Sequence, residues 1–160
     1  MANIIPSRPR MMPQQQRRSF AIVASQYNAT YVRALMDNTS RELGVLVPNA
    51  NVSTYEVPGA FEIPLVVQEI AERGNVDAII ALGVIIKGET QHADLIATAV
   101  TNALLDAGMR FRVPVVHEVL SLANEEQAKA RCMDSELNRG IEAARIAVRM
   151  VQVMGELKAG

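Results

Sequence analysis

The run Ala78–Val84 (AIIALGV) is the feature that most constrains the fold of this chain. It is aliphatic almost throughout and lacks the alternation of a strand with one face in water, so it predicts a strand buried on both faces. Such strands belong to parallel sheets that helices cover on both sides. The whole predicted strand spans residues 76–85. Three other strands are predicted at 19–25, 51–57 and 113–120.

Segments with helical spacing of apolar residues separate these strands. Gly44, Gly74 and Gly108 are predicted to end the first three helices. Asn124 and Asn138 are predicted to cap the last two. The predicted helices span residues 30–44, 64–73, 91–107, 125–132 and 139 to beyond 151.

The order β-α-β-α-β-α-β-α-α predicts an α/β fold. We expect a three-layer sandwich in which a four-stranded parallel sheet has helices on both faces and right-handed crossovers. Residues 19–160 form one domain in this interpretation. Residues 1–18 are rich in Pro, Gln and Arg without periodicity, so we expect a mobile N-terminal arm, or one that orders only against a neighbour.

The turn 87–91, between the third strand and its helix, has properties of an anion site. The first turn of a helix has free N–H groups and partial positive charge. Gly88 lets the backbone approach a ligand, Thr90 can cap the helix, and Lys87 adds a charge. His92 would lie near the bound group. A capped surface helix with a solvated histidine explains the same residues.

Strand-to-helix turns of a parallel sheet meet at one edge, where ligands bind in such folds. The predicted edge therefore gathers an aromatic ring, a carboxylate, an imidazole and a guanidinium. Their segments are 27–28, 59–62, 87–92 and 120–124, with Arg131 on the helix that follows.

These residues also have structural explanations. Tyr27 would serve as a half-buried loop aromatic, Phe61 as core packing, and Glu62 as a carboxylate that stabilises a helix dipole. Arg131 would be solvated on its helix, and His117 would be a buried histidine within a strand.

Composition limits the function further. A formal net charge of −1 offers no electrostatic basis for binding nucleic acid or an anionic membrane. A single cysteine, Cys132, excludes an internal disulfide, favours a reducing, cytoplasmic setting, and with only two histidines argues against zinc. We expect no nucleophilic role for Cys132. No apolar run reaches the roughly 18–20 residues of a membrane span, and no secretory signal is expected.

Four segments together resemble one family, lumazine synthase. They are VPGAFEIP (57–64), LGVIIKGETQH (82–92), EEQAKAR (125–131) and NRG (138–140). The resemblance runs from about Phe20 to the last helix and leaves out only the arm. It implies the flavodoxin-like version of the predicted three-layer fold.

The resemblance implies a transferase of riboflavin biosynthesis. Its reaction condenses 5-amino-6-(D-ribitylamino)uracil with 3,4-dihydroxy-2-butanone 4-phosphate. The products are 6,7-dimethyl-8-ribityllumazine and phosphate, in the penultimate step of the pathway. The reaction needs no cofactor and no metal. The implied assembly is a homo-oligomer built from pentamers, with sites at subunit interfaces.

The resemblance also implies a role for particular residues. Tyr27 would stack on the pyrimidine, and His92 would transfer protons. The ribityl chain would be held by Ala60, Phe61 and Glu62, and the pyrimidine edge by main-chain groups of Val84, Ile85 and Ile86. The phosphate would bind Glu89, Thr90 and Arg131, while His117 and Arg139 would come from the adjacent chain.

Three positions depart from the family pattern. His117 stands where a Phe is common, and Arg139 replaces a usual Lys. Residues 133–137 lack the usual Gly and Lys. Because this region helps to set subunit contacts, a pentamer, a decamer and a sixty-subunit shell all remain open.

Two other functions fit parts of the sequence. A non-catalytic lumazine- or flavin-binding or shell-forming protein would share the fold, but the set Glu62, His92 and Arg131 argues against it. A flavodoxin-like electron carrier is disfavoured because the first strand does not lead into a phosphate loop rich in Ser, Thr and Gly.

Overall fold

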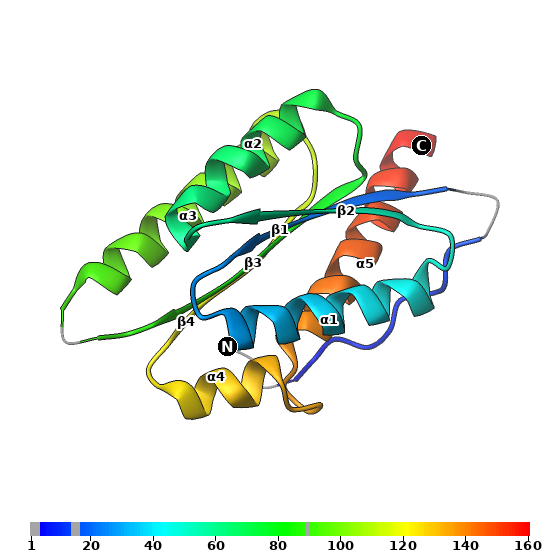
Figure 1. The fold of residues 1–160 in the computed structure, drawn as a ribbon. Coiled ribbons are helices and arrows are strands. Elements are labelled where there is room, and N and C mark those ends of the chain that lie inside the picture. The colour runs from blue at the N-terminus through cyan, green and yellow to red at the C-terminus, as the bar shows by residue number, and fades with distance from the viewer. Residues whose placement is uncertain (1–3, 14–16, 89) are drawn as a thin grey trace.

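The computed structural model describes residues 4–13, 17–88 and 90–160, and shows four strands alternating with helices (Figure 1). A short 3-10 helix, η1, precedes α2. The elements are β1 (Ser19–Ser25), α1 (Ala29–Leu46), β2 (Asn51–Val57), η1 (Ala60–Glu62), α2 (Ile63–Arg73), β3 (Ala78–Ile86), α3 (His92–Phe111), β4 (Val115–Leu122), α4 (Glu125–Cys132) and α5 (Arg139–Ala159).

The four strands form one parallel sheet, as the sequence predicted, and their order in the sheet is β2-β1-β3-β4. β3 lies between β1 and β4, and consecutive residues of β3 point to opposite faces. Ile79 and Ala81 pack in one core, whereas Ile80 and Leu82 pack in the other. Burial of both faces explains why the strand is aliphatic throughout.

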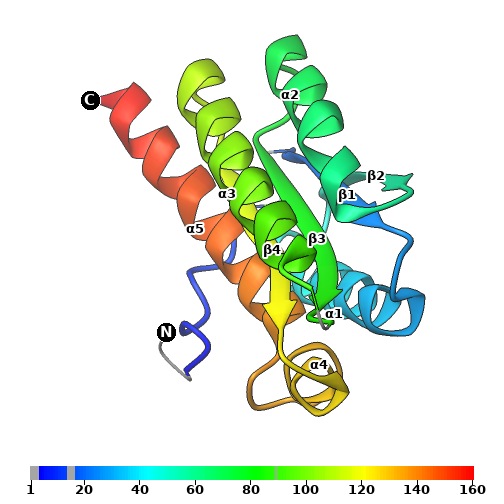
Figure 2. The ribbon, with the colours of Figure 1, turned by 90° about the vertical axis from the view of Figure 1, so that its left-hand side faces the viewer.

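Helices cover both faces of the sheet (Figure 1). α2 and α3 lie on one face, where Val67 and Leu104 join the core that contains Ile79. α1 and α5 lie on the other face, where Leu35 and Val148 join the second core. The predicted three-layer architecture is confirmed. Figure 2 shows α4 beyond the end of β4, next to the carboxyl edge of the sheet.

Two predicted helix ends are wrong. α1 continues past Gly44 to Leu46, because Leu43 and Leu46 in its last turns are buried in the core and offset the low helix propensity of glycine. α3 continues past Gly108 to Phe111 and ends where Arg112 takes a left-handed conformation (φ 54°).

Gly108 has another role than ending the helix. A Cβ atom there would lie 3.2 Å from the carbonyl oxygen of Val113 and 3.3 Å from Cγ2 of Val115. The glycine therefore allows α3 to approach the start of β4 closely.

Four other predicted helix signals are confirmed. Gly74 ends α2 in a left-handed conformation (φ 69°), and Pro64 lies in the first turn of that helix. The side chain of Asn124 accepts a hydrogen bond from the amide of Gln127, and that of Asn138 accepts one from the amide of Ile141.

Residues 4–13 run along α1 and α5 of the same chain (Figure 1). The amide of Met12 donates to the carbonyl oxygen of Leu46 at 3.1 Å, and the Met12 side chain is buried. This segment therefore has partners within its own chain, while its mobility stays a prediction. Within the described ranges, no helix is both long and apolar enough to cross a membrane.

Candidate functional site at the carboxyl edge

Three of the predicted strand-to-helix turns enclose one cavity of ≈ 480 Å³ at the carboxyl edge of the sheet. They are the turns that follow β1, β2 and β3, and the N-terminus of α3 closes one side. The lining residues are Tyr27, Asn28, Gly59, Ala60, Phe61, Glu62, Val84, Ile85, Ile86, Gly88, Thr90, His92, Ala93 and Ile96.

The turn after β1 is held in place by the strands on either side. The amide of Tyr27 donates to the carbonyl oxygen of Pro58 at 3.2 Å, which joins this turn to the one after β2. Asn28 takes a left-handed conformation (φ 57°), and its Nδ2 donates to the carbonyl oxygen of Val84 at 2.7 Å. Asn28 thus already binds a main-chain acceptor that the family resemblance assigns to the substrate.

Asn28 is predicted from the sequence to lie at the sheet edge, but no role is predicted for it there. Its signal is an asparagine between a buried strand and a helix, since Asn tolerates the left-handed region better than most residues. What the sequence could not supply is the partner, because Val84 lies 56 residues away in the chain.

The two aromatic rings of the cavity are open to solvent. The side chain of Tyr27 is 76% exposed and that of Phe61 is 63% exposed. Neither half-burial for Tyr27 nor core packing for Phe61 therefore explains these residues within a single chain. Glu62 follows Phe61 at the end of η1. Its carboxylate lies close to Gly59, where a Cβ atom would be 3.4 Å from Glu62 Oε1.

The turn after β3 differs from the prediction in its charge. Lys87 Nζ forms an ion pair with Asp94 Oδ1 at 3.1 Å and does not line the cavity. Its charge is therefore directed to Asp94 and not to a ligand in the cavity. Thr90 Oγ1 accepts from the amide of His92 at 3.4 Å, a long hydrogen bond, and Gln91 stands at the N-cap position. Glu89 lies outside the described residues.

His92 is the first residue of α3, and it is exposed and lines the cavity. It follows β3, whereas Tyr27 follows the neighbouring strand β1. The cavity thus has an imidazole, a carboxylate and two aromatic rings around main-chain groups of β3. This set can stack a planar ring and transfer a proton, and among the described lining residues there is no Lys or Arg.

Three predicted site residues do not line this cavity within one chain. Arg131 is partly exposed on α4. His117 lies in the middle of β4, where Nε2 is 2.7 Å from Thr101 Oγ1 and Nδ1 accepts from the amide of Val119. Arg139 is buried at the start of α5, and its Nη1 donates to Glu142 Oε2 at 2.7 Å.

Burial changes the protonation of the groups near β4. It lowers the pKa of His117 and raises the pKa of the Cys132 thiol to about 12. Burial, together with a hydrogen bond to Glu142, raises the pKa of Glu118 well above its ordinary range. Across the described residues, no group of three or more His, Cys, Asp or Glu side chains could hold a metal ion.

Comparison with known proteins links this geometry to a family. The profile of the 6,7-dimethyl-8-ribityllumazine synthase family matches residues 17–155, a range that contains all four motifs quoted above. Three curated proteins that carry the name 6,7-dimethyl-8-ribityllumazine synthase are similar to this chain. The protein of Halorhodospira halophila (strain DSM 244 / SL1) is 41% identical over 143 residues, which cover 88% of this chain and 90% of that protein.

The two other relatives match to a similar extent. The protein of Polaromonas sp. (strain JS666 / ATCC BAA-500) is 36% identical over 87% of this chain and 88% of its own length. The protein of Burkholderia vietnamiensis (strain G4 / LMG 22486) is 40% identical over 82% of this chain and 76% of its own length.

Proposed function

The chain belongs to the 6,7-dimethyl-8-ribityllumazine synthase family, and on that premise we propose how its residues carry out the family's reaction. It is a transferase of riboflavin biosynthesis. It condenses 5-amino-6-(D-ribitylamino)uracil with 3,4-dihydroxy-2-butanone 4-phosphate to give 6,7-dimethyl-8-ribityllumazine and phosphate.

The cavity at the carboxyl edge is the site for the pyrimidine substrate. The exposed ring of Tyr27 stacks on the pyrimidine, since a flat ligand covers apolar surface that water otherwise contacts. Ala60, Phe61 and Glu62 hold the ribityl chain, and main-chain groups of Val84, Ile85 and Ile86 recognise the pyrimidine edge. Asn28 already donates to the Val84 carbonyl, and alternate residues of the strand face β4, as Lys87 does through its bond to Leu122. Ile86 is therefore the freer of these partners.

His92 transfers protons between the reacting groups. Imine formation, loss of phosphate and ring closure each move a proton, and an exposed imidazole at the rim of the cavity can donate and accept one. Holding two substrates together can lower the barrier by roughly 7–11 kcal/mol. One general acid or base accelerates a reaction by about 10²–10⁴-fold, which corresponds to only ~3–5 kcal/mol. Positioning therefore contributes more to the rate than His92 does.

The phosphate needs a cation, and none is present among the described residues that line the cavity of one chain. Thr90 offers main-chain groups next to the N-terminus of α3, but the described lining residues include no Lys or Arg. We propose that Arg131 supplies the charge from an adjacent subunit, together with His117 beside the heterocycle. Arg139 is a weaker partner, because its side chain is 6% exposed and already paired with Glu142.

Exposed apolar side chains next to the cavity support a site between subunits. Leu65 near the start of α2 is 76% exposed, and Leu95 near the start of α3 is 68% exposed. Together with Tyr27 and Phe61 they form a surface that a monomer would leave in water, which favours association. We propose a homo-oligomer built from pentamers, located in the cytoplasm.

One pair of measurements tests this proposal. Mixing the purified protein with both substrates should produce lumazine fluorescence and one phosphate per lumazine. Light scattering should give a mass that is a multiple of five chains of 17.4 kDa. A monomer that is fully active would contradict the shared site, and an oligomer that binds lumazine without turnover would establish the non-catalytic alternative.

A further inference from the structure

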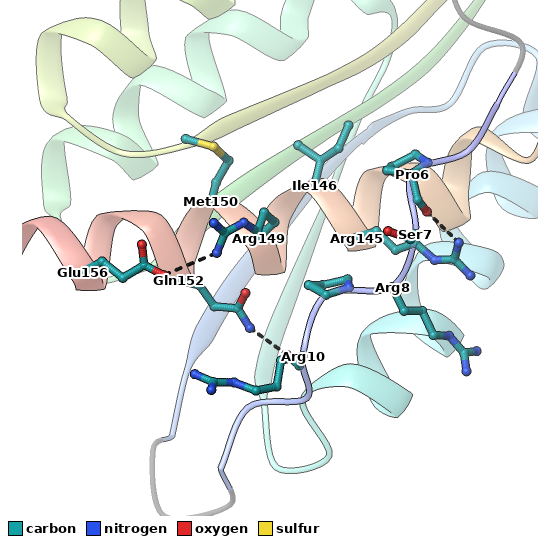
Figure 3. Close-up of a pocket in the computed structure, with 11 residues that line it drawn as sticks. Pro6, Ser7, Arg8, Arg10, Arg145, Ile146, Arg149, Met150, Gln152 and Glu156 are labelled. Atoms are coloured by element: carbon teal, nitrogen blue, oxygen red, sulfur yellow. Dashed lines mark hydrogen bonds and ion pairs between the residues drawn. The ribbon is translucent and has the colours of Figure 1, made fainter.

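A second and larger crevice lies between residues 6–10 and α5 (Figure 3). Its volume is ≈ 670 Å³, and it shares no lining residue with the cavity at the carboxyl edge. The lining residues are Pro6, Ser7, Arg8, Pro9, Arg10, Arg145, Ile146, Arg149, Met150, Gln152 and Glu156.

Residues 6–10 form one wall of this crevice, and hydrogen bonds from α5 hold them in place. Arg145 Nη1 donates to the carbonyl oxygen of Pro6 at 2.7 Å, and Gln152 Nε2 donates to the carbonyl oxygen of Arg10 at 2.6 Å (Figure 3). The two bonds lie at the two ends of the segment 6–10. The crevice is therefore a defined feature of the fold, because both of its walls are fixed to each other.

The crevice carries excess positive charge. Arg8, Arg10, Arg145 and Arg149 line it, whereas the carboxylates close to them are Glu42 and Glu156. Four guanidinium groups thus face two carboxylates in a chain whose formal net charge is −1. A concentration of positive charge in a concave region attracts anions.

The arginines differ in how firmly they are held. Glu42 is buried and binds Arg8 at 2.8 Å and Arg145 at 2.6 Å, so those two side chains stabilise the crevice itself. Arg149 pairs with Glu156 at 3.4 Å, with both side chains more than half exposed. Such an exposed pair contributes little to stability, so a bound anion can replace Glu156 as the partner of Arg149.

We propose that this crevice binds a small phosphorylated organic molecule that carries at least two negative charges. Arg149 from α5 and Arg10 from the opposite wall contact its phosphate groups, since the guanidinium fork matches phosphate in geometry and charge. Ile146 and Met150 offer apolar surface to its carbon skeleton. The bound molecule bridges the two walls and holds residues 6–10 against α5.

Isothermal titration calorimetry of the full-length oligomer tests the site, with fructose 1,6-bisphosphate and inorganic pyrophosphate as the probes. We expect one bisphosphate per chain and competition between the two probes. Arg149→Gln and Arg10→Gln should each weaken binding by about tenfold or more, as expected for loss of one charge-assisted hydrogen bond. Fructose, which lacks the charge, should not bind.

Two variants serve as controls. Arg110→Gln removes an exposed arginine whose partner Asp106 lies at the same 3.4 Å, and it should leave binding unchanged. Arg131→Gln removes the proposed cation of the reaction site and should also leave it unchanged. Unaltered binding in Arg149→Gln and Arg10→Gln would overturn the proposal, as would loss of binding in Arg131→Gln or no binding at all. If pyrophosphate binds and the bisphosphate does not compete with it, the proposal that the ligand is an organic phosphate is wrong.

Limited proteolysis gives an independent readout. Trypsin can cut after Arg10 but not readily after Arg8, which precedes Pro9. The bisphosphate should slow cleavage of the Arg10–Met11 bond in the unmodified protein and not in Arg149→Gln. Equal cleavage with and without ligand would contradict the bridging of the two walls, whatever the activity of the reaction site.

Discussion

Nε2 of His117 lies 2.7 Å from Oγ1 of Thr101, while Nδ1 of the same ring accepts the amide hydrogen of Val119. A ring nitrogen that accepts an N–H bond carries no proton, so the proton of the neutral ring is on Nε2 and is donated to Thr101. The strand and α3 thus select one tautomer. A second proton would have to displace the amide of Val119.

We expect the pKa of His117 in the folded protein to lie below its ordinary value of 6.5, because burial disfavours the charged ring. A histidine with a lowered pKa contributes stability above its unfolded pKa, and this contribution is lost as the pH falls through the folded pKa. Lowering the pH from about 7 to 5 should therefore reduce the free energy of unfolding more in the unmodified protein than in the His117→Phe variant. Chemical denaturation at each pH measures this difference. An equal loss in both proteins would contradict this assignment.

A buried charge network surrounds Arg139. Glu118 is held protonated by burial and by its hydrogen bond to Glu142, whose carboxylate binds Arg139. Glu118→Gln keeps a neutral group of the same shape, so it should change the free energy of unfolding by less than about 1 kcal/mol at a pH below 4.5, where Glu118 is protonated in the folded and the unfolded chain. Glu142→Gln leaves the guanidinium unpaired and should cost about 3–5 kcal/mol.

The same network predicts a pH dependence. A carboxyl with a raised pKa contributes stability that is complete below its unfolded pKa of 4.5 and is lost as the pH rises towards the folded value. Glu118→Gln removes this titration, so its stability relative to the unmodified protein should rise with pH above 4.5. Denaturation midpoints across this range would measure the effect, and a constant difference would exclude a protonated Glu118.

Two glycines of α5 should respond to alanine in opposite directions. A Cβ at Gly140 would lie 2.6 Å from the carbonyl oxygen of Leu35 and 3.0 Å from Cβ of Asn38, both on α1. Gly140→Ala should therefore push the helices apart and lower the free energy of unfolding by about 2 kcal/mol or more. At Gly155 nothing lies within 4 Å, so Gly155→Ala should raise it by about 0.5–1 kcal/mol. Thermal unfolding compares the two, and equal shifts would refute the close approach.

Steady-state kinetics separate the roles of His92 and Arg131. His92→Ala should lower kcat by about 10²-fold without abolishing turnover, because positioning of both substrates persists. Arg131→Ala should raise KM for the phosphate-bearing substrate by at least about tenfold, as expected for loss of a charge-assisted contact. A dead His92 variant together with an unharmed Arg131 variant would reverse the assignment.

Cys132 should be inert in the folded protein although Arg131 precedes it. Its side chain is 0% exposed and burial raises the pKa of the thiol to about 12, so little thiolate is available. A disulfide reagent at about pH 8 should label no thiol before unfolding and one thiol per chain in denaturant. Rapid labelling of the folded protein would show that the thiol is accessible.

The fold could be predicted because local sequence patterns determine which segments form strands and helices. Both faces of β3 are buried, so its residues had to be aliphatic, and the caps at Asn124 and Asn138 follow from the side chains themselves. The ends of α1 and α3 could not be predicted from Gly44 and Gly108. Burial of Leu43 and Leu46 and the approach of β4 to α3 decide them, and both depend on residues distant in the chain.

By itself the sequence determined the strands, their order with the helices, the turns that meet at the sheet edge and the family to which the chain belongs. The tertiary structure decided which of the site residues meet. It placed His92 and Tyr27 on one cavity, paired Lys87 with Asp94, and enclosed Arg139 with Glu142. The physical reason is that hydrophobic periodicity depends only on residues close together in the sequence. The partner of a polar side chain depends on how separate elements pack.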